Sequence, residues 1–338
     1  MGSTGSDSVL DFAHATEAVR GIARRTPLLE EPALSEKLGV PVWLKAECLQ
    51  VTGSFKVRGA AACLSALSEH ERERGVVACS SGNHGRAVAY VAERLGISAT
   101  VCVPTWVDPV KLEGIRARGA EAVLVGDTFD ESEAYALELA STSGRRYVSA
   151  YDDPWVIAGQ GTLAREILDQ LHAIPSAVLV PLSGGGLIGG IAAAFQEKLL
   201  EGAPRMVAVS AETAAVMLAS VRAGKTVDLP EQETLANALA GGIGLDNQYS
   251  FELVRDRVQE HVSVSEDEIG NAMAYAATSL RLVLEGGGAV ALAAVLAGVW
   301  PPQGDGSGSH VLDPERPVVV VLSGGNVAPA TLASVLSR

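Results

Sequence analysis

Lys56 is the residue of this sequence whose surroundings most favour chemistry over solvation. It stands in the segment TGSFKVRGA, residues 52–60, at what the pattern predicts to be the first turn of a helix, with no acidic residue beside it. Most lysines are surface charges, so a lone lysine says little about catalysis. A lysine whose amine is kept largely neutral can form an imine with a carbonyl compound or accept a proton. The chemistry of Lys56 therefore depends on its partners.

Three other segments have the same predicted order of elements, in which an apolar strand leads into a turn of serine and glycine and then into a helix. They are residues 76–79 followed by SSGNHG at 80–85, residues 178–180 followed by SGGG at 183–186, and residues 318–322 followed by SGGN at 323–326. Each turn can aim backbone N–H groups at an anion near a helix N-terminus. One lysine and three such turns predict a small, phosphate-bearing cofactor that is held covalently.

The four segments, taken together and in this order, resemble the fold-type II pyridoxal-phosphate enzymes, most closely the serine/threonine dehydratase and serine racemase family. The resemblance extends over nearly the whole chain. It implies an α/β fold of two domains like the tryptophan synthase β subunit, with parallel-rich sheets flanked by helices. It also implies pyridoxal 5'-phosphate as the cofactor and a carbon–oxygen or carbon–nitrogen lyase as the enzyme class.

The resemblance assigns roles to individual residues. Lys56 would be the Schiff-base lysine, and after substrate frees it, the base that takes the α-proton. Ser81 matches the family serine that can hand a proton to the opposite face of the substrate. The residues that would bind the cofactor besides Lys56 are Ser183, Gly184, Gly185, Gly186 and Leu187 at the phosphate, Asn83 at the ring hydroxyl, Glu285 at the cofactor edge and Ser323 at the pyridine nitrogen. The residues that would grip the substrate carboxylate are Ser80, Ser81, Gly82 and His84.

The glycine loop has a second interpretation. The segment GGGLIG, residues 184–189, satisfies the Gly-x-Gly-x-x-Gly pattern, and Glu212 follows at about the spacing of a dinucleotide site. Taken alone, the loop therefore leaves NAD open, and Lys56 with the other two turns decides against it. Glu212 also falls where metal-dependent family members carry a carboxylate ligand. The partner position six residues later is Leu218, so no metal site is predicted, because hard cations need several oxygen ligands.

The predicted function is a dehydratase, or ammonia-lyase, that removes water and ammonia from a β-hydroxy amino acid of the L-threonine or L-serine type to give a 2-oxo acid. One alternative is a dehydratase for an unusual β-hydroxy amino acid, such as those of hydroxyectoine breakdown, because the stretch NALAGG at 237–242 replaces a frequent Asp-Gly pair. A second alternative is an amino-acid racemase, given Ser81. A third, from another class, is a nucleotide-binding protein of Rossmann type.

The elements that must position these residues alternate along the chain. Strands are predicted at 42–45, 76–79, 100–103, 122–125, 147–150, 178–180, 206–210 and 318–322, and helices at 9–24, 85–95, 110–118, 132–142, 266–284 and 288–299, with one more beginning at Lys56. Strands separated by helices favour parallel sheets. We expect residues 1–65 plus 152–338 to form a large cofactor-binding domain and residues 70–150 a small inserted α/β domain.

Composition limits the partners. The chain has 338 residues and a formal net charge of −14, which argues against nucleic acid and anionic membranes as partners. Cys48, Cys63, Cys79 and Cys102 have no metal-binding spacing and indicate buried thiols in a reducing compartment. The first six residues carry no secretory signal. These features predict a cytoplasmic enzyme with an amino-acid substrate, and the family resemblance implies a homodimer.

Overall fold

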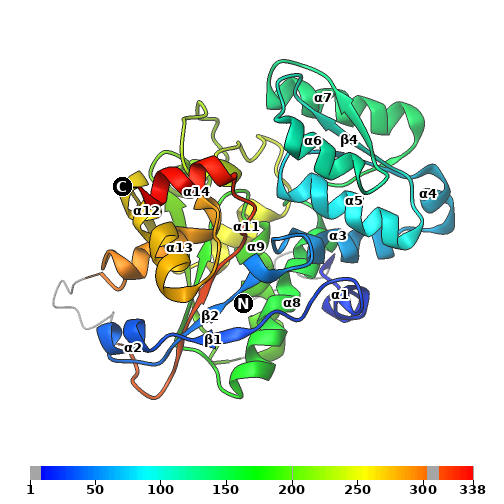
Figure 1. Cartoon of the computed structure of the whole chain (residues 1–338). Coiled ribbons are helices and arrows are strands. Elements are labelled where there is room, and N and C mark those ends of the chain that lie inside the picture. Colours follow the sequence, from blue (N-terminus) through cyan, green and yellow to red (C-terminus); the bar gives the residue numbers. More distant parts are fainter. Residues whose placement is uncertain (1–8, 200, 303–311, 338) are drawn as a thin grey trace.

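The strands form two separate sheets. The computed structural model describes residues 9–199, 201–302 and 312–337. Figure 1 shows the cyan and teal elements, together with α4 (Glu69–Arg74), gathered in one lobe and most of the other elements in a second, larger lobe. The strands are β1 (Leu28–Glu30), β2 (Val42–Lys45), β3 (Val76–Cys79), β4 (Ala99–Val103), β5 (Glu121–Leu124), β6 (Arg146–Tyr147), β7 (Ala177–Pro181), β8 (Arg205–Ala211), β9 (Glu260–Val264) and β10 (Val318–Val321).

The larger sheet has six strands within the described residues, in the order β1-β2-β10-β7-β8-β9. All its neighbours run parallel except β1, which is antiparallel to β2. The central strands are apolar throughout and fully buried, as expected for a parallel sheet covered on both faces. One face packs on a cluster that includes Leu292 of α13, and the other on a cluster that includes Ile188 of α9.

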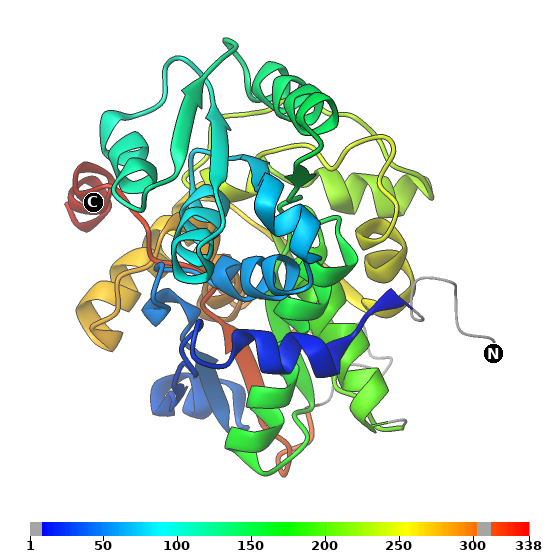
Figure 2. The same ribbon diagram turned by 90° about the vertical axis from the view of Figure 1, so that its right-hand side faces the viewer.

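The smaller sheet has four parallel strands within the described part of the chain, in the order β5-β4-β3-β6. Its hydrophobic core joins these strands to the helices that flank them. Figure 2 shows these strands and their helices at the top of the molecule. The parallel order that the sequence predicts for residues 76–150 is therefore confirmed.

The helices connect the strands and cover the sheets. They are α1 (Phe12–Val19), α2 (Pro32–Leu38), α3 (Lys56–Ser65), α4 (Glu69–Arg74), α5 (Asn83–Leu95), α6 (Pro109–Arg116), α7 (Phe129–Ser143), α8 (Pro154–Leu171), α9 (Gly186–Leu199), α10 (Val216–Ala223), α11 (Ser250–Arg257), α12 (Glu266–Tyr275), α13 (Gly286–Leu296) and α14 (Pro329–Leu336), with short turns η2 (Glu47–Leu49), η3 (Asn237–Leu239) and η4 (Ala276–Leu280). The predicted strands and most predicted helices are present, with bounds shifted by a few residues.

Three predicted elements are shorter than expected. The first helix covers Phe12–Val19 instead of 9–24, because the Asp11 side chain caps its start and Gly21 takes a φ of 77° after its end. The helix predicted over 266–284 changes to a π turn at Ala276–Leu280 and then leaves helical geometry. The strand predicted over 147–150 ends at Tyr147, because the next carbonyl groups bind side chains instead of a neighbouring strand.

Helix α3 contacts elements of both lobes. It begins at Lys56 and its buried side chains, such as Val57 and Leu64, share a core with Val76 of β3 and Val88 of α5. Its other contacts run to α8 beside the larger sheet. The predicted division into two domains thus stays a prediction.

Two further features bear on the sequence predictions. No helix in the described ranges is long and apolar enough to span a membrane. The first eight residues, on which the prediction of no secretory signal rests, lie outside the described residues.

Candidate active site

Lys56 is fixed where the smaller and larger sheets approach each other. It is the first residue of α3, and the two residues before it are tied to the turn that follows β10. The Phe55 N–H donates to the Ser323 carbonyl at 3.1 Å, and Ser54 forms an antiparallel bridge with Gly324. The sequence motifs around Lys56 and Ser323 are therefore hydrogen-bonded to each other, although 267 positions separate them along the chain.

The Lys56 amine has a single described hydrogen bond, to the Ala150 carbonyl at 2.6 Å. Burial lowers the pKa of Lys56 from 10.5 to about 8, and the negative charge of Glu285 limits the drop. About a tenth of this amine is thus neutral at pH 7, and about half of it at pH 8. The neutral amine is the form that can attack a carbonyl carbon or accept a proton.

This pKa gives a direct prediction for the cofactor-free protein. Competitive labelling of Lys56 with acetic anhydride is expected to be half-maximal near pH 8 in the folded protein and near pH 10.5 in denaturant. The unfolded state binds more protons between these two values, so the contribution of Lys56 to folding stability rises as the pH rises through this window. Mass spectrometry of the Lys56 peptide measures both curves, and coincident curves would contradict the lowered pKa.

The segment that follows β6 connects three of the predicted motifs. The Val148 carbonyl lies 2.8 Å from His84 Nε2, and the Ala150 carbonyl accepts from Lys56. The Tyr151 ring occupies the space that a side chain at Gly184 would need. The segment 148–151 therefore brings the lysine, the SSGNHG turn and the glycine loop to one place.

Beyond Tyr151, the chain is hydrogen-bonded to the start of α11 (Ser250–Arg257). The Asp152 carboxylate accepts hydrogen bonds from the backbone N–H groups of Gln248, Tyr249 and Ser250 at 2.7–2.9 Å, at the start of α11. Asp153 caps α8 through the N–H groups at its first turn. Sequence reasoning missed this segment, because carbonyl groups that bind distant side chains leave no local pattern.

The SSGNHG turn stands between β3 and α5. The Gly82 N–H donates to Ser80 Oγ at 3.1 Å, and Ser81 is half-buried in the same turn. A side chain at Gly85 would overlap the Ser80 carbonyl, so glycine is required for the chain to turn this tightly. Because α5 begins at Asn83, the unpaired N–H groups of its first turn lie where a carboxylate could bind.

His84 is held as a neutral ring. Burial, with the positive charge of Lys56 as the second cause, lowers the pKa of His84 to about 3. The Val148 carbonyl can only accept, so His84 Nε2 carries the proton and Nδ1 is left as an acceptor. Nδ1 is buried and has no partner among the described residues. An acceptor of this kind is available to a bound molecule.

Asn83 links the two sheets through its side chain. Its Nδ2 donates to Glu285 Oε1 at 2.5 Å, and its Oδ1 accepts from Asn326 at 2.6 Å. Asn326 also donates to the Thr52 carbonyl at 2.8 Å. The predicted cofactor ligands Asn83 and Glu285 are thus adjacent, and the asparagine of the SGGN turn joins them.

Glu285 reaches this position because the preceding helix ends early. Arg281 takes a φ of 61° after the π turn, and the chain then runs without helix to Glu285, the N-cap of α13. Burial raises the pKa of Glu285 to about 7, while the Asn83 hydrogen bond and the nearby charges of Lys111 and Arg86 limit the rise. This carboxyl group can therefore change its charge near neutral pH.

The glycine loop between β7 and α9 is packed too tightly for larger residues. A side chain at Gly186 would come within 2.5 Å of the Tyr151 carbonyl oxygen, and Gly185 has a φ of 83°. The first N–H groups of α9, from Gly186 onward, lack intrahelical partners. Ser183, Gly184, Gly185, Gly186 and Leu187 therefore form a backbone cradle that suits an anion such as phosphate.

Of the two remaining predicted residues, Ser323 lies in the turn that is bonded to Phe55, whereas Glu212 lines a different cavity. Ser323 is buried behind α13, with its Oγ 3.4 Å from the Gly287 carbonyl oxygen. Glu212 is exposed at the end of β8 and lines a separate cavity of about 220 Å³, with Leu218 and Arg222 on the same wall. In the described part of the chain, no group of three His, Cys, Asp or Glu side chains could hold a metal ion.

Comparison with known proteins adds to this geometry. The family model described as "Pyridoxal-phosphate dependent enzyme" matches residues 19–331. The L-threonine ammonia-lyase of Geobacter sulfurreducens is 39% identical over 96% of this chain and 77% of its own length. Among solved structures, threonine deaminase isoform 2 of Solanum lycopersicum has a TM-score of 0.87 at 34% identity, covering 99% of this chain and 89% of that one. Maize serine racemase also has a TM-score of 0.87, at 30% identity, with 97% of both chains covered.

Proposed function

Because this chain belongs to the pyridoxal-phosphate dependent enzyme family, we propose that it converts a β-hydroxy amino acid of the L-threonine or L-serine type into a 2-oxo acid and ammonia. The chain is a pyridoxal-phosphate dependent lyase. Membership also answers the question left open by the Gly-x-Gly-x-x-Gly loop, in favour of pyridoxal phosphate over NAD. The observation that carries the substrate proposal is the position of the Lys56 amine, which the 148–151 segment holds beside the SSGNHG turn.

The residues present fit the cofactor. Ser54 Oγ and His84 Nδ1 are buried and have no partner among the described residues, so a bound molecule could satisfy both. The cradle of residues 183–187 would hold the phosphate through backbone N–H groups. Asn83 would face the ring hydroxyl and Ser323 the ring nitrogen. When bound, pyridoxal phosphate supplies an electron sink that stabilises negative charge on the substrate α-carbon.

The substrate carboxylate would bind at the start of α5. Its partners would be the hydroxyls of Ser80 and Ser81 and the backbone N–H groups of the first turn of α5 from Asn83 onward, which favour an anion. Neutral His84 adds no positive charge here, and its free Nδ1 can only accept, so it would not bind the carboxylate directly. A carboxylate held here fixes the orientation of the α-carbon relative to Lys56.

Lys56 would hold the cofactor through Nζ and, once free, would take the proton from the substrate α-carbon. Its lowered pKa suits this role, because a base is most effective when its pKa lies near the working pH. Loss of the β-hydroxyl as water follows, and the released product takes up water to give the 2-oxo acid and ammonia. Ser323 offers the ring nitrogen a hydroxyl instead of a carboxylate, which favours prompt elimination over a long-lived negative charge.

A substrate screen tests this proposal. The holoenzyme is expected to release a 2-oxo acid from L-threonine or L-serine at least about 10-fold faster than it forms the D-amino acid. The panel should include β-hydroxy amino acids with longer side chains, because the stretch at 237–242 departs from the family pattern. Coupled lactate dehydrogenase and chiral chromatography measure the two products. Dominant D-amino acid formation would favour a racemase instead.

Ser81 separates these two activities. Racemisation needs a proton donor on the face of the substrate opposite the lysine, whereas elimination does not. Ser81→Ala is therefore expected to lower D-amino acid formation about 100-fold or more and 2-oxo acid release less than about 10-fold. Equal losses of both products would show that Ser81 acts on substrate binding alone.

The assembly and location complete the proposal. We propose a homodimer, as the family resemblance implies, which light scattering would reveal as a mass of twice the chain. The four cysteines are free thiols, three of them buried, which supports the reducing environment of the cytoplasm. The partner of the enzyme is then its amino-acid substrate.

A further inference from the structure

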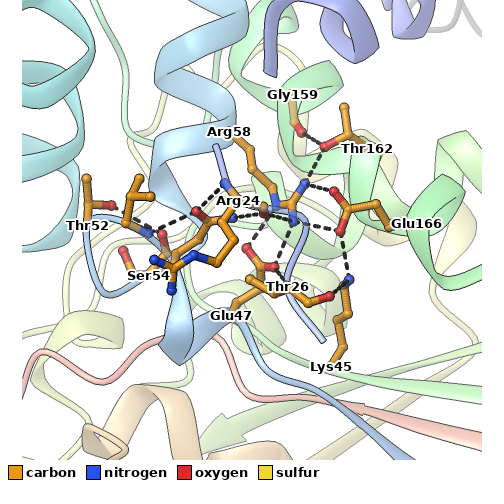
Figure 3. A network of polar contacts seen from close by, with 12 residues as sticks. Arg24, Thr26, Lys45, Glu47, Thr52, Ser54, Arg58, Gly159, Thr162 and Glu166 are labelled. Carbon is orange, nitrogen blue, oxygen red and sulfur yellow. Dashed lines mark hydrogen bonds and ion pairs between the residues drawn. The ribbon is translucent and has the colours of Figure 1, made fainter. Parts of the chain in front are cut away.

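Arg58 lies two residues after Lys56 on α3, and its side chain is fully buried. Its guanidinium binds the Glu47 carboxylate through Nε at 2.8 Å and Nη2 at 2.9 Å. It also binds the Glu166 carboxylate through Nη1 at 2.7 Å and Nη2 at 2.9 Å. Figure 3 shows Arg58 between the two acidic side chains. One side chain of the lysine helix therefore makes two bidentate ion pairs with two other elements.

A second cation completes the cluster. Lys45 Nζ binds Glu166 Oε2 at 2.7 Å, the Thr26 carbonyl at 2.8 Å and Gln170 at 2.8 Å. Thr26 Oγ1 donates to Glu47 Oε1 at 2.5 Å. Two cations thus face two carboxylates, and the charges of the cluster balance. Balanced and hydrogen-bonded charges are the arrangement in which ions tolerate burial.

The ion-pair cluster joins the elements that hold both ends of the Lys56 hydrogen bond. Glu47 follows β2, Arg58 is on α3, and Glu166 is on α8. The first residues of α8 follow directly from the segment whose Ala150 carbonyl accepts from Lys56. The donor on α3 and the acceptor before α8 are therefore both anchored through Arg58.

The charges of the ion-pair cluster are not among the causes that shift the pKa of Lys56. The causes that shift the pKa of Lys56 are its burial and the charge of Glu285, and both lie outside the cluster. A buried ion pair also seldom adds folding stability, because proteins in which apolar side chains replace such a pair are often as stable. Its geometric contribution is the rigid, bidentate orientation that arginine gives.

We propose that Arg58 is a positioning residue, whose ion pairs to Glu47 and Glu166 hold the first turn of α3 so that Lys56 Nζ reaches the reacting carbon and proton. This inference rests on the proposed function only for its kinetic consequences. A displacement of about 1 Å at a reacting group can cost about 100-fold in rate. Loss of the ion pairs is therefore expected to reduce the reactivity of Lys56 in a protein that remains folded.

Two variants distinguish an effect on the position of Lys56 from an effect on folding stability. Arg58→Met leaves Glu47 unpaired in the core and is expected to lower Tm by about 5–10 °C. The double variant Arg58→Met, Glu47→Gln removes that charge, while Lys45 still pairs with Glu166, so most of the Tm should return. We expect kcat of the double variant to stay about 10–100-fold low, with KM within about 2-fold. If kcat recovers together with Tm, the cluster is structural only.

A second readout does not depend on the substrate. In cofactor-free protein, the Lys56 amine condenses with the aldehyde of added pyridoxal, water leaves, and borohydride then reduces the C=N bond to a stable adduct. We expect adduct formation at Lys56 to be at least about 5-fold slower in the double variant, with the labelling midpoint still near pH 8. Equal rates in wild type and double variant would overturn the inference, whether or not β-hydroxy amino acids prove to be substrates.

Arg205→Met is the matched control. Arg205 pairs with Glu260 at 2.9 Å and joins β8 to β9, away from α3. Because this pair is partly exposed, its loss should lower Tm only slightly and leave kcat and the rate of adduct formation at Lys56 within about 2-fold of wild type. An equal loss of Lys56 reactivity in this variant would mean that any lost ion pair has the same effect, and would also overturn the role of Arg58.

Discussion

Replacing Lys56 with alanine is expected to lower 2-oxo acid release by about 10⁴-fold or more, the largest effect of any single substitution in this protein. The substitution removes both the amine that would hold the cofactor and the base that would take the α-proton. The same variant should show no covalent cofactor after borohydride, whereas the wild-type protein should retain it. Absorption spectra and mass spectrometry of the treated proteins measure this directly.

The control for this variant is another lysine. Lys225 is exposed in the turn after α10, so Lys225→Ala should keep wild-type turnover. The Tm of Lys56→Ala should stay near or above that of the wild type at neutral pH, because the buried amine is costly when charged. A Lys56→Ala protein that is folded and keeps more than about 1% of wild-type turnover would contradict the assignment of Lys56 as the base.

Gly186→Ala is expected to weaken pyridoxal-phosphate binding by about 100-fold. A β-carbon at Gly186 would lie 2.5 Å from the Tyr151 carbonyl oxygen and 2.9 Å from the Tyr151 α-carbon. Both contacts are with backbone, so the loop must shift and its N–H groups lose their common direction. Titration of the cofactor-free protein, followed by fluorescence or absorbance, gives the dissociation constant.

Gly242→Ala is the corresponding control. Nothing lies within 4 Å of a β-carbon built at Gly242, and its φ is not positive. Cofactor affinity should therefore remain within about 2-fold of wild type. If both variants bind the cofactor like wild type, residues 183–187 do not form the phosphate site, and the anion must be held elsewhere.

The sequence predicts those parts of the site whose signals are local. The strands β3, β7 and β10 are short apolar runs, and each is followed within two residues by a turn of serine and glycine. Such signals are complete within about a dozen residues, so the positions of Lys56, the SSGNHG turn and the glycine loop follow from them. The assignment of these residues to individual cofactor groups remains a prediction from resemblance.

The sequence did not predict elements that depend on contacts with distant parts of the chain. Strand β9 has the sequence EHVSV, which mixes polar and apolar residues, and it forms the edge of the larger sheet. It is a strand because β8 offers it a partner, and no pattern within the segment itself requires that. The π turn after α12 was missed as well, and the early end of the helix there lets the chain place Glu285 beside Asn83.

The ion-pair cluster shows a third kind of difficulty. Lys45 closes an otherwise apolar strand, and Arg58 stands in a helix of small apolar residues. Each looks like a surface position when considered alone, because charged residues are seldom fully buried without partners. Their partners, Glu47 and Glu166, are 11 and 108 residues away from Arg58 in sequence. A buried charge network can be recognised only when the fold brings its members together.

The place of β10 in the larger sheet also determines when the enzyme can first become active during its synthesis. β10 is the last described strand in the sequence, yet it lies between β2 and β7 and pairs with both. Until the ribosome has released it, β2 and β7 have no common neighbour and the residues before Lys56 cannot bond to Ser323. A chain that lacks this strand therefore has no assembled lysine site, and activity is expected only after β10 has been made and has paired with β2 and β7.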